Sequence, residues 1–136
     1  MRVAFYKGRK RIFNRLVAWW TRGPYSHCEL VLDDGSAVSS SFMDGGVRYK
    51  HIDFAPDLWD FVEIGPEYPA IRERIYVKYG RGYDWRGLIG FVFRRVADHR
   101  EKEFCSEFVM SVIGYDEAWR FDPNTAKSAL EHKHGR

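Results

Sequence analysis

Two residues that lie far apart in the chain, His27 and Cys105, have side chains that can carry out thiol chemistry. Cys105 begins an apolar stripe that recurs at steps of three and four residues, which predicts a helix closed by Gly114 at its C-terminus. In the first turn of a helix, the unpaired N–H groups and the helix dipole favour a thiolate, and can lower a cysteine pKa from about 8.5 to ~3.5–7.5. The sequence therefore offers Cys105 as a nucleophile. The alternative interpretation is a small buried apolar residue.

His27 lies in residues 25–32, which read as a strand, and Asp33-Asp34-Gly35 then forms a tight hairpin turn. The two-residue period of a strand places His27 on the same face as Glu29, and Cys28 on the opposite, apolar face. A thiol nucleophile needs a base of this kind, together with a third group that orients the base. We therefore expect His27 to face a site and Cys28 to belong to the core.

The length and composition predict a single domain over residues 1–130, followed by a polar tail at residues 131–136. Hydrophobic residues make up 45% of the 136-residue chain, which is enough for one core. Aromatic residues make up 17%, and such a surplus favours some of them lining a groove or a partner surface. The net charge of +3 is uneven, since Lys7, Arg9, Lys10, Arg11 and Arg15 crowd the beginning of the chain.

The periodicity along the chain predicts an α+β fold with a small antiparallel sheet of about four to five strands packed against helices. Strands are expected at residues 3–6, 25–32, 36–42, 47–52 and 58–64, and a meander is the economical way to connect them. Helices are expected at residues 12–20, 68–79 and 85–95, in the Cys105 stretch, and after the Asp122-Pro123 helix start.

Three stretches of the chain resemble the circularly permuted NlpC/P60, or YiiX-like, papain-fold cysteine hydrolases. They are residues 16–35 with their Tyr25-Ser26-His27 strand start, residues 82–91, and the segment Phe104-Cys105-Ser106-Glu107-Phe108-Val109. The order also matches, with the histidine strand first and the nucleophile helix near the C-terminus. The resemblance implies a permuted papain-like fold, and relatives that include amidases, peptidases and the lecithin:retinol acyltransferase group.

This resemblance implies that Cys105 attacks an amide, ester or thioester carbonyl and that His27 is the general base. The family has a polar third residue, such as Glu or His, on the strand after the histidine strand. Here that strand reads Val38-Ser39-Ser40-Ser41-Phe42, without a carboxylate or an imidazole. Ser39 is the first candidate for this position, with Glu29 and Ser41 as alternatives. Ser39 can equally be an ordinary strand hydroxyl, and Glu29 a solvated strand residue.

Two further residues, Tyr25 and Ser106, are candidates for contact with the substrate or with the oxyanion. For Tyr25 a packing role is the competing interpretation. Neither a metal nor a cofactor is expected, because the remaining histidines have no metal-ligand spacing with one another or with the cysteines; these are His51, His99, His132 and His134.

The expected partner is a peptide, a peptidoglycan or a lipid acyl substrate. No motif for specific nucleic-acid recognition is present. The alternative function is a non-catalytic binding module on the same fold, which grips an acidic partner or a membrane surface through its basic first helix. No apolar run reaches the ~20 residues of a membrane span, and no signal peptide is evident. These features favour the cytoplasm, unless another system releases the protein, as happens for phage lytic proteins.

Overall fold

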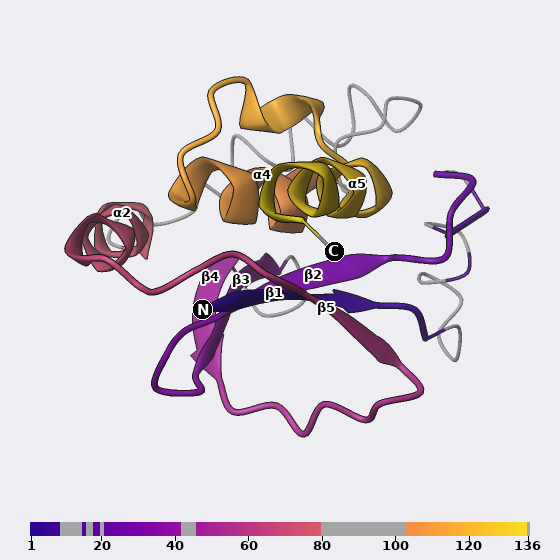
Figure 1. Cartoon of the computed structure of the whole chain (residues 1–136), viewed down its shortest axis with the longest axis horizontal. Helices are drawn as coiled ribbons and strands as arrows, with labels where there is room; N and C mark the ends of the chain where they lie inside the picture. Colours follow the sequence, from indigo (N-terminus) through magenta and orange to yellow (C-terminus); the bar gives the residue numbers. More distant parts are fainter. Residues whose placement is uncertain (9–14, 16–17, 20, 42–45, 80–102, 136) are drawn as a thin grey trace.

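The computed structural model describes residues 1–8, 15, 18–19, 21–41, 46–79 and 103–135 (Figure 1). The helix predicted at residues 12–20 lies mostly outside the described residues, although Arg15, Ala18 and Trp19 are helical. The helix predicted at residues 85–95 and the basic run at residues 9–11 lie entirely outside them. Functional expectations that rest on those two segments therefore stay predictions.

Five antiparallel strands form one sheet in the order β4-β3-β2-β1-β5. They are β1 (Arg2–Tyr6), β2 (His27–Val31), β3 (Ala37–Ser41), β4 (Gly46–Lys50) and β5 (Trp59–Glu63). The predicted α+β class and the antiparallel sheet are confirmed. The simple meander is wrong for β5, which pairs with β1 and places Val62 opposite Val3. The connection from β4 to β5 passes beneath the sheet to reach that edge (Figure 1).

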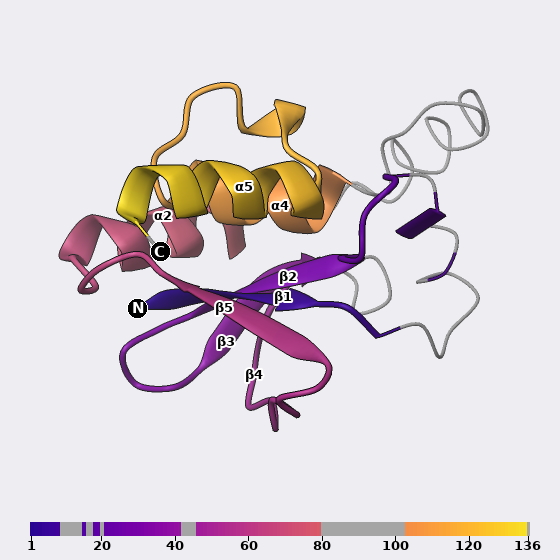
Figure 2. The ribbon, with the colours of Figure 1, turned by 45° about the vertical axis from the view of Figure 1, so that its right-hand side comes forward.

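Three α-helices among the described residues lie on one side of the sheet (Figure 2). They are α2 (Pro69–Tyr79), α4 (Glu103–Val112) and α5 (Pro123–His134), with the short 3₁₀ helix η2 (Ala118–Arg120) between the last two. No helix in the described part of the chain is long and apolar enough to cross a membrane.

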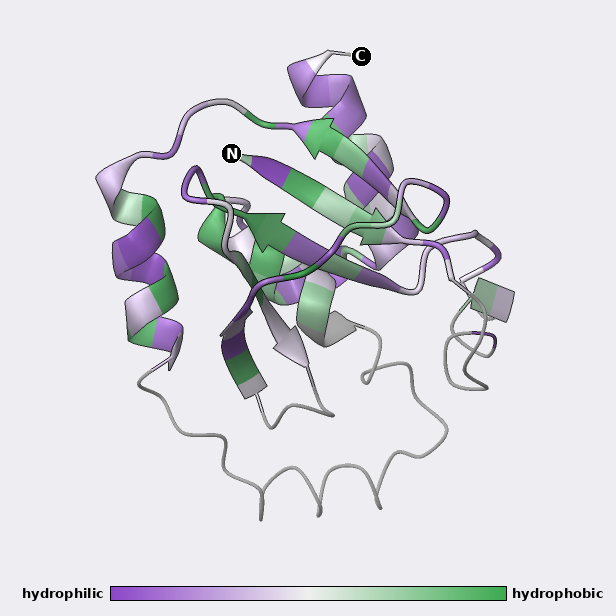
Figure 3. Ribbon diagram, turned by 90° about the horizontal axis from the view of Figure 1, so that it is seen from below, coloured by the Kyte–Doolittle hydropathy of each residue, from purple (hydrophilic) through white to green (hydrophobic). Residues whose placement is uncertain are grey.

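Buried hydrophobic side chains from the sheet and the helices form one core cluster, and Figure 3 shows hydrophobic residues, in green, on both the strands and the helices. Alternation along β1 and β2 turns Val3, Phe5, Cys28 and Leu30 into this core, and all four side chains are fully buried. The helices contribute Ile71 and Ile75 from α2, Phe108, Val109, Met110 and Val112 from α4, and Ala126 and Leu130 from α5. Each large apolar side chain buried in this way stabilises the fold by about 1.5–3 kcal/mol. This packing holds α4 against β2.

The C-terminus of α4 and the N-terminus of α5 both carry capping residues that can be recognised in the sequence. Gly114 ends α4 with φ at 95°, and the Tyr115 N–H donates to the Met110 carbonyl, as in a Schellman motif. Asp122 begins α5 with a capping box, in which its carboxylate accepts from the Asn124 and Thr125 N–H groups.

The polar tail expected at residues 131–136 begins as the last turn of α5, which ends at His134. Leu130 anchors this last part of the helix in the core, and Lys127 pairs with Glu131 one turn later at 2.5 Å. The polarity of these residues reflects the solvent-facing side of a helix.

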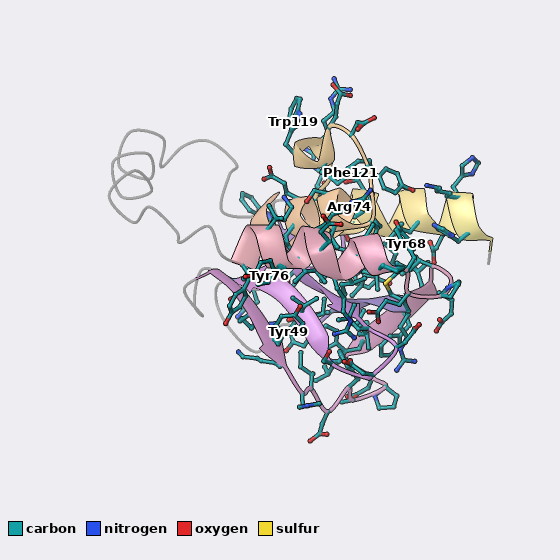
Figure 4. All side chains as sticks on the ribbon, turned by 90° about the vertical axis from the view of Figure 1, so that its left-hand side faces the viewer. Tyr49, Tyr68, Arg74, Tyr76, Trp119 and Phe121 are labelled. Atoms are coloured by element: carbon teal, nitrogen blue, oxygen red, sulfur yellow. The ribbon has the colours of Figure 1, made fainter. Side chains whose placement is uncertain are left out.

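Several large aromatic side chains are exposed, as the composition suggested. They are Trp19, Tyr49, Tyr68, Tyr76, Tyr79 and Trp119. Figure 4 shows Tyr49 and Tyr76 far from Trp119, which projects from η2. The Tyr49 and Tyr79 rings are in contact, with centroids 6.1 Å apart. These aromatics are therefore divided between separate parts of the surface.

Candidate active site

The first turn of α4 packs against the beginning of β2 and brings Cys105 to His27. Cys105 is the third residue of α4, and only 7% of it is exposed. His27 is the first residue of β2, and its side chain, 24% exposed, forms a hydrogen bond with the Cys105 side chain. The fold therefore joins a nearly buried thiol to an imidazole that solvent can still reach.

Cys105 is surrounded by groups that stabilise a thiolate. Its pKa is held well below the ordinary value by a hydrogen bond from the Cys28 side chain, by the charge of His27 and its hydrogen bond, and by the Cys28 backbone N–H. Burial acts in the opposite direction but does not prevail. Cys105 is consequently the cysteine with nucleophilic character.

Cys28 has the complementary property. Burial and its contact with Cys105 raise the pKa of the Cys28 thiol, so Cys28 keeps its proton and can donate it to the Cys105 sulfur. The sequence predicted a core residue, and Cys28 is fully buried in the core. Its contact with Cys105 was not predicted, because strand alternation had placed Cys28 and His27 on opposite faces and no spacing links Cys28 to α4.

His27 lies between Cys105 and a carboxylate. Its Nε2 is 2.7 Å from Glu29 Oε1, and the ring also forms a hydrogen bond with the Cys105 side chain. Burial lowers the pKa of His27, but the charges of Cys105 and Glu29 and their hydrogen bonds outweigh burial and raise it to about 10. A pKa of about 10 favours a protonated imidazole at neutral pH, and such a cation stabilises a thiolate at Cys105.

Glu29 is held from its other side by Arg48 of β4. The Arg48 guanidinium donates from Nη1 to Oε2 at 2.7 Å and from Nη2 to Oε1 at 2.5 Å. Burial raises the pKa of Glu29, whose side chain is 1% exposed, but the hydrogen bonds and charges of Arg48 and His27 lower it overall. A bidentate guanidinium also fixes the carboxylate in one orientation, which in turn orients His27.

The first candidate for the third residue, Ser39, is not the group that contacts His27. The Ser39 hydroxyl is buried and donates its single proton to the Cys28 carbonyl at 2.8 Å. Ser41 ends β3 opposite Gly46, and among the described residues the hydrogen-bond partners of the His27 ring are Cys105 and Glu29. Glu29 takes this position because residues two apart share a strand face and its longer side chain reaches the ring.

Tyr25 and Ser106 have hydroxyls that are committed to protein partners. Tyr25 donates to Asp60 Oδ2 at 2.5 Å, and burial together with this hydrogen bond raises the pKa of the phenol. Ser106 is fully buried and donates to the Phe121 carbonyl at 2.5 Å. These contacts favour a structural role for both side chains over contact with an oxyanion.

Arg48 was missed by sequence analysis. A buried carboxylate on a strand requires a cationic partner, so a buried Glu29 would have pointed to a residue such as Arg48. The sequence, however, does not show that Glu29 is buried. Within the described residues, no group of three or more His, Cys, Asp or Glu side chains is arranged to hold a metal ion.

In comparisons with protein-family models, curated proteins and solved structures, no match to the chain was found. The resemblance in the sequence motifs, together with the geometry above, is therefore the basis for a functional proposal.

The roles of Glu29 and Ser39 can be separated by the pKa of His27. In Glu29→Gln the carboxylate charge that raises the pKa is lost, so we expect the pKa of His27 to fall below about 10. Imidazole NMR shifts across a pH titration give this value directly. Ser39→Ala is the matched control and should leave it unchanged. A fall in Ser39→Ala, with none in Glu29→Gln, would return Ser39 to the third position.

The contribution of Cys28 can be measured through the reactivity of Cys105. Cys28→Ala removes the S–H donor, so the pKa of Cys105 should rise and its alkylation by iodoacetamide should need higher pH. Cys28→Ser keeps a donor and should show a smaller change. Mass spectrometry of the labelled peptide gives the pH midpoint in each variant; identical midpoints in all three proteins would contradict this role.

The Arg48–Glu29 pair should matter for stability far more than an exposed pair. Arg48→Met leaves Glu29 with only His27 as its cation, and we expect a loss of about 3 kcal/mol in the free energy of unfolding. Arg72→Met is the control, because Arg72 pairs with Asp34 and Glu67 at the exposed surface and should cost about 1 kcal/mol or less. Urea denaturation measures both values, and equal losses would contradict the buried pair's importance.

Proposed function

We propose that the protein is a thiol-dependent hydrolase or acyltransferase that acts on amide, ester or thioester carbonyls through an acyl-Cys105 intermediate. The observation that carries this proposal is the His27 ring, held between the Cys105 sulfur and the buried Glu29 carboxylate. A nucleophile, a base and a group that orients the base are the parts that covalent acyl transfer requires.

In the first step, the Cys105 thiolate attacks the carbonyl carbon and a C–S bond forms. The carbonyl electron pair moves to oxygen, and backbone N–H groups in the first turn of α4 are suited to stabilise this oxyanion. When the carbonyl re-forms, the bond to the leaving group breaks and the His27 imidazolium gives its proton to the departing nitrogen, oxygen or sulfur. Acyl-Cys105 and neutral His27 remain.

In the second step, neutral His27 accepts a proton from water or from another acceptor, which attacks the thioester. The acyl group leaves as an acid in hydrolysis, or bonded to the acceptor in acyl transfer, and the Cys105 thiolate and the His27 imidazolium are restored. Glu29 keeps its charge throughout and stabilises the imidazolium, as an orienting carboxylate does.

The arrangement supports the permuted papain-like interpretation of the fold, because the histidine strand β2 precedes the nucleophile helix α4 in the chain. Peptides, peptidoglycan stem peptides and lipid acyl groups all present a suitable carbonyl.

The buried Glu29 charge favours catalysis over a purely binding role. Burying a carboxylate together with two cations carries a large desolvation cost, and a module that binds its partner elsewhere on the surface would not need such a buried group.

The proposal predicts a covalent intermediate on one cysteine. On mixing with p-nitrophenyl acetate at neutral pH, the protein should release p-nitrophenol and gain one acetyl group on Cys105, seen by intact-mass and peptide mass spectrometry. Cys105→Ala should lose both signals while staying folded, whereas Cys28→Ala should still be acetylated on Cys105, but more slowly because the pKa of Cys105 is higher. Acetylation that persists at the same rate in Cys105→Ala would contradict the proposal.

A further inference from the structure

The first turn of α5 contacts residues on both sides of the candidate site. Ser106, next to Cys105 in the chain, donates its hydroxyl to the carbonyl of Phe121, which lies just before α5. Asn124, the second residue of α5, contacts Tyr25, two residues before His27. A single short segment is thus bonded to the nucleophile helix and to the approach to the histidine strand.

The Asn124 side-chain amide pairs with both backbone groups of Tyr25. Its Oδ1 accepts from the Tyr25 N–H at 3.1 Å, and its Nδ2 donates to the Tyr25 carbonyl at 3.1 Å. The same Nδ2 donates to Thr21 Oγ1 at 2.9 Å. Only a primary amide offers an acceptor and two donors in one plane, so an isosteric carboxylate cannot reproduce this pattern.

The neighbouring residues are arranged around this amide. Gly23 approaches it so closely that a Cβ there would lie 2.2 Å from Asn124 Oδ1, which a side chain at that position cannot tolerate. The backbone of Asn124 is itself held by Asp122, whose Oδ1 accepts from the Asn124 N–H at 2.7 Å. The amide is therefore fixed to the helix on one side and to the 21–25 segment on the other.

We infer that Asn124 is a positioning residue, which sets the His27 imidazole against the Cys105 sulfur by fixing the Tyr25 backbone. The inference rests on the proposed function and adds a residue to that site. Residue 26 is already bonded to β1, since its N–H donates to the Tyr6 carbonyl at 2.9 Å. Asn124 supplies the link from this strand start to the helical layer that carries Cys105.

The test compares two substitutions in the same helical turn. Asn124→Asp keeps the shape and favours the helix N-terminus by its charge, but it loses both donors and repels the Tyr25 carbonyl. Thr125→Ala breaks the capping box and weakens α5 without touching residues 21–25. The measurement is the rate of Cys105 alkylation by iodoacetamide as a function of pH, read by mass spectrometry, together with the thermal unfolding midpoint.

We expect Asn124→Asp to slow Cys105 alkylation at about pH 6 by about tenfold or more, as a misplaced partner group does. Thr125→Ala should lower the unfolding midpoint and leave the alkylation profile unchanged. Should Asn124→Asp fail to fold, Asn124→Ala carries the same expectation. Equal alkylation profiles in Asn124→Asp and the unsubstituted protein, or equal changes in both variants, would overturn the positioning role.

The same experiment separates this inference from the proposed function. If Cys105 of the unsubstituted protein is not alkylated below about pH 8, the reactive thiolate is absent and the proposed function fails. If it is alkylated there and Asn124→Asp behaves identically, the function stands and only the role of Asn124 is lost.

Discussion

The Glu29 carboxylate, enclosed between Arg48 and His27, is the interaction on which the rest of the site depends. A buried carboxylate without cations would be protonated or would unfold its surroundings, but two hydrogen bonds from Arg48 keep it ionised. Its charge then helps to keep His27 protonated, and protonated His27 keeps Cys105 a thiolate. Positive and negative groups thus alternate from Arg48 on β4, through Glu29 and His27 on β2, to Cys105 on α4, and each charged group helps to stabilise the charge of the next.

The fold positions these charged groups by holding β4, β2 and α4 in fixed places relative to one another. Antiparallel pairing places Ser39 opposite Arg48, which brings the guanidinium to the face that carries Glu29. The hydrophobic core packs α4 against β2, so that Cys105 in the first turn of α4 lies beside His27. Cys28 lies where the core meets the site and contributes a thiol that is both packed and a donor to Cys105. Packing and electrostatics are therefore not separable at this position.

Much of this architecture could be predicted from local pattern, and the remainder depends on contacts that local pattern does not encode. The α4 helix followed from the spacing of Cys105, Phe108 and Val112 with Gly114 after them, and β2 followed from alternation before an Asp-Gly turn. The pairing of β5 with β1 did not follow, since the same alternation suits either edge of a sheet. Ser39 was favoured over Glu29 because the third residue was expected on the strand after the histidine strand. The sequence does not show that the Glu29 side chain, on the histidine strand itself, reaches the His27 ring. Arg48 and the Cys28 contact required the assembled core.

The central claim is that Cys105 is a thiolate at neutral pH because a protonated His27 lies beside it. Ultraviolet absorbance of the thiolate, measured as the difference between the protein and Cys105→Ala across a pH titration, tests this most directly, since Cys28 remains protonated and contributes nothing to the difference. The account predicts the absorbance of one thiolate at about pH 7, and its loss at that pH in His27→Ala. A difference signal that rises only near the ordinary cysteine pKa of about 8.5, with or without His27, would contradict it.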